Sequence, residues 1–163
     1  MSVLLNRRAE SKMEYVNTAC NIHDETINFL SRLSARYSRI FTEGTAEVAG
    51  SLMDHAVEAD AIFPNTEAKL AQRQAHLVEA KACLAALDVR LLRIYNILKL
   101  NPKGAFAHGN DKDDKRKPLT VDDALRRLEY MAESIGLMIK SEEQLLEGTM
   151  TSDKKQFREQ YGK

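Results

Sequence analysis

The chain has 163 residues, of which 44% are hydrophobic and 29% charged, and its formal net charge at neutral pH is zero. This length suits a single domain with a sizeable core, and the composition excludes wholesale disorder. Because the charges balance, the protein as a whole attracts no charged partner, and nucleic-acid binding would require local basic patches.

The sequence also argues against zinc-knuckle, secreted and membrane-spanning proteins. The two cysteines, Cys20 and Cys83, show neither CxxC spacing nor a dense framework, which indicates reduced thiols in a reducing cytosol. No stretch approaches the roughly 20 apolar residues of a membrane span. The opening segment MSVLLNRRAESK has too short an apolar run for a signal peptide. We therefore expect a cytoplasmic protein.

The first two helices are predicted from apolar residues that recur at about 100° per residue. The first runs from about residue 9 to 41, with Tyr15, Ile22 and Phe29 on its apolar face. Gly44 suits the left-handed residue that ends a helix, and Thr45 suits the capping position of the next. The second helix is therefore expected over about 45–62, and Pro64 lies in the break that follows it.

The third predicted helix, about 67–100, carries apolar residues on two opposite sides. One stripe consists of Leu70, Leu77, Ala80, Leu84, Leu87, Leu91, Ile94 and Leu98. The far side carries Ala71 and five further small or branched residues. One bundle core covers only one side of a helix, so we expect a neighbouring subunit to cover the other. The predicted oligomer interface comprises Val78, Ala82, Ala85, Val89 and Leu92.

A long surface loop, a fourth helix and a frayed tail are predicted after the third helix. The loop covers residues 102–119, which contain two glycines and show no periodicity. Thr120 and Asp123 form a variant capping box that starts a helix over about 120–150. Residues 152–163 are polar and are expected to fray. These elements predict an all-α, antiparallel, up-down-up-down four-helix bundle that occupies the whole chain, residues 1–163.

Candidate residues for catalysis or metal binding are few. Polar side chains interrupt the apolar faces at His23, Asp88 and Glu142, and the topology brings His76 to a height similar to that of His23 and Glu142. Di-iron bundles use Glu-x-x-His motifs, which this chain lacks, so a buried hydrogen-bonded pair such as His23 with Glu142 is the favoured interpretation. No nucleophile elbow or P-loop occurs. We predict no enzymatic activity, no catalytic residue, no metal and no cofactor.

Basic residues are expected to gather toward one end of the bundle. Lysine and arginine side chains gathered there are suited to binding phosphates. The alternatives are a solvated face paired with Glu47, Asp54 and Glu58, or charge complementarity between subunits. The candidate nucleic-acid or polymerase contacts are Arg32, Arg36, Arg39, Arg90, Arg93, Lys115, Arg116, Lys117, Arg126 and Arg127.

Most of the chain resembles a known family. The segments EYVNTACNIHDETINFLSRLSARYSRIF, HLVEAKACLAALDVRLLRIYNILKLNPKGAF and ALRRLEYMAESIGLMIKSEEQLL are similar to Avd-type accessory proteins, which are encoded beside the reverse transcriptases of bacterial diversity-generating retroelements. They also resemble the four-helix-bundle proteins of 23S rRNA intervening sequences. The resemblance implies an antiparallel bundle that assembles into a homopentamer, binds the reverse transcriptase and nucleic acid, and performs no chemistry itself.

The leading hypothesis is therefore a non-enzymatic, oligomeric accessory protein that binds a reverse transcriptase, its template RNA, or both. This chain is neutral where the family is strongly basic, which favours polymerase binding over direct RNA binding. The alternative is a structural or protein-interaction bundle without a nucleic-acid role, in which the arginines serve subunit contacts. No membrane partner is expected.

Overall fold

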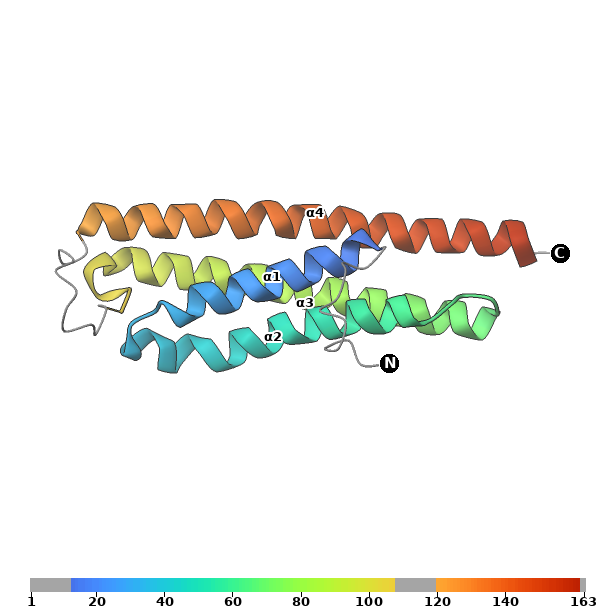
Figure 1. Cartoon of the computed structure of the whole chain (residues 1–163), viewed down its shortest axis with the longest axis horizontal. Helices are drawn as coiled ribbons and strands as arrows, with labels where there is room; N and C mark the ends of the chain where they lie inside the picture. The colour runs from blue at the N-terminus through green and yellow to red at the C-terminus, as the bar shows by residue number, and fades with distance from the viewer. Residues whose placement is uncertain (1–12, 108–119, 162–163) are drawn as a thin grey trace, which may run out of the picture.

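A computed structural model describes residues 13–107 and 120–161. Within these ranges the chain forms α1 (Glu14–Ser31), α2 (Ala35–Ala61), α3 (Glu67–Leu100) and α4 (Val121–Tyr161), with a short 3-10 helix, η2 (Pro102–Gly104). Successive α-helices run in opposite directions (Figure 1), and α1 and α3 each pack against both α2 and α4. The prediction of an all-α antiparallel four-helix bundle is confirmed. No helix in the described ranges is long and apolar enough to cross a membrane.

The core forms where the apolar stripe of each helix turns inward. On α3 the buried positions alternate spacings of three and four residues, which keeps them on one side of the helix. Each fully buried leucine contributes about 1.5–3 kcal/mol relative to an exposed one. The buried α3 residues are Arg73, Leu77, Ala80, Leu84, Leu87, Leu91, Ile94 and Leu98.

Threonine side chains fix the starts of α3 and α4. The Lys69 amide donates to Thr66 Oγ1 at 3.3 Å, and the Asp123 amide donates to Thr120 Oγ1 at 3.1 Å. The Thr120 hydroxyl also donates to the Asp123 carboxylate at 2.7 Å, which holds the pKa of that carboxyl below its usual range. These caps satisfy amide groups that a helix start leaves unpaired. Both predicted starts are confirmed, and α3 has the predicted extent.

The predicted boundary between the first two helices is wrong. The chain turns at residues 32–34 instead of 42–45, and Gly44 lies inside α2. The Ser34 amide donates to the Ala105 carbonyl at 3.0 Å, and the Ala107 amide donates to the Arg32 carbonyl at 2.9 Å. The turn is therefore fixed by a distant segment of the chain. A Cβ at Gly44 would lie 3.0 Å from Nη1 of Arg90, so a larger residue there would displace the flexible end of that side chain.

The first part of the predicted loop is packed against this turn. The Ser34 hydroxyl donates to the Gly104 carbonyl at 2.7 Å, and Leu33 and Phe106 form an isolated antiparallel bridge. Ala105 and Phe106 are buried. The expectation of a surface loop is thus wrong for residues 102–106, and residues 108–119 lie outside the described ranges.

The tail predicted to fray is helical as far as Tyr161. Helix α4 continues beyond the N-terminal end of α1 and lies beside the end of the α2–α3 hairpin (Figure 1). Asp153 is buried there and accepts a 2.6 Å hydrogen bond from Nε of Arg73. An ion pair removed from water holds this part of α4 on the bundle, so the prediction of fraying is wrong over residues 152–161.

Glu142 does not pair with His23. The His23 ring is partly exposed and contacts Asp24, with Nδ1 and Oδ1 3.1 Å apart. Glu142 is fully buried, and neither of its carboxylate oxygens has a hydrogen-bond partner in the described residues. Burial raises the pKa of Glu142 to about 8, so the carboxyl is mostly protonated at neutral pH. The expected pair is absent because His23 lies at the edge of the buried face of α1.

Candidate functional site

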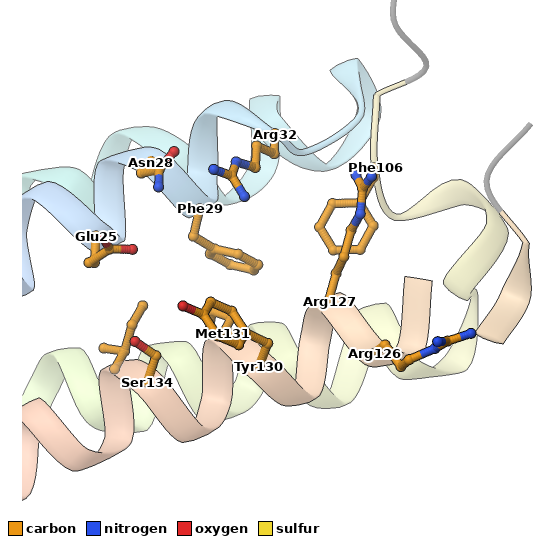
Figure 2. A pocket seen from close by; sticks show the side chains of 11 residues that line it. Glu25, Asn28, Phe29, Arg32, Phe106, Arg126, Arg127, Tyr130, Met131 and Ser134 are labelled. Atoms are coloured by element: carbon orange, nitrogen blue, oxygen red, sulfur yellow. The ribbon is translucent and has the colours of Figure 1, made fainter. Parts of the chain in front are cut away.

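A groove of about 440 Å³ lies between α1 and α4 at the end of the bundle where the chain turns from α1 to α2. Figure 2 shows Phe29 of α1 and Arg32, which directly follows α1, on one side of the groove and Tyr130 and Met131 of α4 on the other. Phe106 closes the end near the α1–α2 turn. The groove therefore combines cationic, aromatic and apolar side chains from three segments that are distant in sequence.

Two packed aromatic rings form the wall of the groove at the end near Phe106. Phe29 and Phe106 meet edge to face, with ring centroids 6.5 Å apart. The Arg127 guanidinium lies 5.8 Å from the centroid of the Phe106 ring, in cation–π range (Figure 2). Phe106 is buried, so its ring is fixed and limits where the guanidinium lies. This contact presents Arg127 at the mouth of the groove.

The arginines of the groove differ in their ionic partners. Arg126 lies 3.4 Å from Asp123, on its own helix, and points away from Arg127 (Figure 2). Within residues 13–107 and 120–161, no carboxylate forms an ion pair with Arg32 or Arg127. Glu25 lines the far end of the groove. An arginine without a carboxylate partner keeps its donors available for phosphate or for a partner's acidic side chain.

A second hollow, of about 200 Å³, lies between α2 and α3 on another side of the bundle. Arg90 and Arg93 line it together with Ile40 and Phe41. Arg36 and Arg39 are exposed at the start of α2, and the Arg36 guanidinium lies 5.7 Å from the Tyr37 ring centroid. The described candidate arginines therefore share one end of the bundle but divide between two faces.

The structure gives little support to the alternative in which the arginines pair with the carboxylates of Glu47, Asp54 and Glu58 on α2. Glu58 accepts contacts from two histidines, and no ion pair within the described ranges joins an arginine to Glu47, Asp54 or Glu58. Lys115, Arg116 and Lys117 lie outside the described residues, so their place relative to the groove stays a prediction.

The second apolar side of α3 is exposed along most of the helix. Its positions alternate spacings of four and three residues, as in a coiled-coil seam. Small residues dominate, so the backbone of a partner helix has room to approach closely. We refer to this set as the α3 seam; it comprises Ala71, Ala75, Val78, Ala82, Ala85, Val89 and Leu92.

Sequence reasoning missed the aromatic part of the groove. Tyr130 is exposed and follows Arg126 and Arg127 by four and three residues, a spacing that places all three on neighbouring parts of one helix surface. That spacing is the signal that was available for Tyr130. Phe106 carried no local signal, because its position depends on the contact between residues 104–107 and the α1–α2 turn.

Comparisons with known proteins add no assignment: no family model, no curated protein and no solved structure matches this chain.

Proposed function

We propose that this protein is a non-catalytic, oligomeric accessory protein that binds a reverse transcriptase, its template RNA, or both, in a diversity-generating retroelement. The observation that carries the proposal is the arginine–aromatic groove between α1 and α4. The resemblance of three sequence segments to Avd-type proteins supplies the class of partner.

The groove carries the two kinds of side chain that bind single-stranded nucleic acid, cationic and aromatic. Arg32 and Arg127 offer guanidinium donors for phosphate oxygens, and the exposed Tyr130 ring offers a surface on which a base can stack. Base stacking on an aromatic side chain contributes about 1–3 kcal/mol and tolerates any sequence. An accessory protein that handles a variable template needs this kind of recognition.

The α3 seam supports an oligomer. Its heptad spacing and exposure fit a helix from another copy, and a homopentamer is the state that the resemblance implies. An oligomer would present several copies of the groove, which raises the avidity for a long RNA or for a polymerase with more than one contact. This gives the neutral chain a route to nucleic-acid binding without a large net charge.

Fluorescence polarisation with a labelled single-stranded RNA of about 20 nucleotides tests the RNA half of the proposal. We expect binding near physiological salt that weakens as salt rises, because phosphate contacts release counterions. The polymerase half is tested by co-purification with the reverse transcriptase. Failure of both would overturn the proposal.

A second candidate function is a structural or interaction bundle without a nucleic-acid role. The zero net charge and the division of the arginines between two faces favour it. In that case, replacement of Arg90 and Arg93 by alanine alters the oligomeric state. The wild-type protein then binds no RNA. Size-exclusion chromatography with light scattering separates this candidate from the first.

A further inference from the structure

We propose that His55, Glu58 and His76 form a binding site for one divalent transition-metal ion, with Zn²⁺ as the ion that fits best. Nδ1 of His76 lies 2.9 Å from Oε2 of Glu58, and Nδ1 of His55 lies 3.0 Å from the same oxygen. The two Nδ1 atoms are 3.5 Å apart. Three ligand atoms of the types that zinc prefers therefore converge on one point of the surface.

The size of this triangle matches a metal site. Zinc lies about 2.0–2.2 Å from imidazole nitrogen and carboxylate oxygen. Ligand atoms around such an ion are separated by about 3.0 Å in octahedral and about 3.4 Å in tetrahedral geometry. The separations observed here are 2.9, 3.0 and 3.5 Å, each within about 0.1 Å of one of these values. A point about 1 Å above the plane of the three atoms is about 2.1 Å from each of them. An ion would thus enter without a rearrangement of the helices.

The backbone holds the three side chains in place. His55 and Glu58 are three residues apart on α2 and share one face of that helix, and His76 faces them from α3. Helices α2 and α3 form a tight hairpin and pack against each other. Ala56 and Leu77, each next to a histidine in sequence, are fully buried and anchor the two backbones. The site therefore stands on two helices that the core packs together.

The site is open to solvent on one side. The side chains of His55 and His76 are 30% and 25% exposed, and that of Glu58 is 52% exposed. An ion held by three protein ligands keeps at least one coordination position for water or for an external ligand. Imidazole with one carboxylate also suits Co²⁺, Ni²⁺ and Cu²⁺, so relative affinities are expected to follow the usual order of divalent metals.

Hydrogen bonding alone is the competing explanation. In that arrangement both Nδ1 atoms carry a hydrogen and donate to one carboxylate oxygen, and no ion is needed. The two explanations differ in their response to added metal. A metal site binds one ion per chain with a defined affinity, whereas a hydrogen-bonded trio on a helical surface binds metal only weakly.

The test is a Zn²⁺ titration of the full chain, purified without a histidine tag, in competition with a chromophoric chelator. We expect one ion per chain in the wild type, and an affinity at least about tenfold lower in His55→Gln and in His76→Gln. The matched control is His23→Gln, because His23 contacts Asp24 at a similar distance but has no third ligand. Its affinity for Zn²⁺ should equal that of the wild type.

Glu58→Gln provides a second variant that keeps the side-chain volume and removes the charge at an exposed position, so folding is not at risk. It should also lose affinity, and added Zn²⁺ should raise the melting temperature of the wild type but not of Glu58→Gln. Binding that persists in both histidine variants, or a thiolate charge-transfer band when Co²⁺ is bound, would overturn the proposal. Binding in the wild type no tighter than in Glu58→Gln would overturn it as well.

Discussion

Nε of Arg73 donates a 2.6 Å hydrogen bond to Oδ2 of Asp153, which lies 80 residues further along the chain. The two side chains are only 5% and 11% exposed. Nη1 of Arg73 also donates to the Ala59 and Ile62 carbonyls, at 2.6 and 3.2 Å, where α2 ends. One guanidinium therefore ties the end of α2 and the last turns of α4 to α3.

We expect Asp153→Ala to destabilise the protein by about 3–5 kcal/mol. The substitution leaves the Arg73 charge buried without its partner, and such a charge is costly to hold away from water. Urea unfolding followed by circular dichroism measures the change. Lys155→Ala, an exposed substitution in the same turn, is the control and should leave the unfolding midpoint nearly unchanged. A midpoint in Asp153→Ala equal to that of the control would contradict the role of this pair.

Ionisation of the Glu142 carboxyl should lower the free energy of unfolding as pH rises. Its folded pKa of about 8 lies above the ordinary value of 4.5, so the folded state holds the proton more tightly than the unfolded state does. The stabilisation is fully present below about pH 4.5 and is lost as pH rises toward about 8. The loss amounts to about 3–5 kcal/mol, since each pKa unit corresponds to about 1.4 kcal/mol.

Glu142→Gln removes this titration and should be more stable than the wild type at pH 8.5. The comparison requires unfolding curves at several pH values for the wild type, for Glu142→Gln and for the exposed neighbour Glu143→Gln. Glu143→Gln should follow the wild type. If Glu142→Gln shows the same fall in stability between pH 5 and 8, another group is responsible.

Leu92→Asp should shift the protein to a smaller oligomer while leaving its helicity intact. Leu92 lies in the α3 seam and is 58% exposed in the single chain, so a charge there disturbs an intersubunit contact and not the core. The control is Leu137→Asp on α4, a leucine that is 64% exposed and lies outside the seam. Light scattering after size exclusion gives the mass of each species. A change of mass in Leu137→Asp alone would place the interface elsewhere.

The double substitution Arg32→Ala/Arg127→Ala should weaken RNA binding and reduce its dependence on salt. If each arginine contacts one phosphate of a single strand, the slope of log affinity against log salt falls by about 1.4 in magnitude. Lys155→Ala/Arg158→Ala, near the opposite end of α4, serves as the control and should keep the wild-type slope. An unchanged slope in the groove variant would show that these arginines do not contact phosphate.

The limits of a helix could be predicted where residues close in sequence, such as a capping threonine or a proline, determine them. The limits of α3 follow from the Thr66 cap and from Pro102 just beyond Leu100, and the start of α4 follows from Thr120. The exposure of the α3 seam also followed from sequence, because one core leaves the second apolar side uncovered. The class of fold depends on these local features and was correct.

The errors occur where a distant segment decides the local structure. Gly44 suits a helix end, yet the chain turns ten residues earlier because residues 104–107 bind the backbone of Arg32 and Ser34. The polar tail stays helical because Asp153 meets Arg73, and the sequence around Asp153 contains no sign of that partner. The histidine–glutamate cluster was missed for the same reason, since it depends on the register between α2 and α3.

We propose that this bundle serves a reverse transcriptase, and co-purification tests that proposal most directly. The protein is co-expressed with a reverse transcriptase from a diversity-generating retroelement, and the complex is isolated at physiological salt through a tag on the polymerase. We predict that the two proteins elute together in a fixed ratio and that Arg32→Ala/Arg127→Ala reduces the amount recovered. Absence of the bundle from the eluate, with both proteins folded and soluble, would contradict the account.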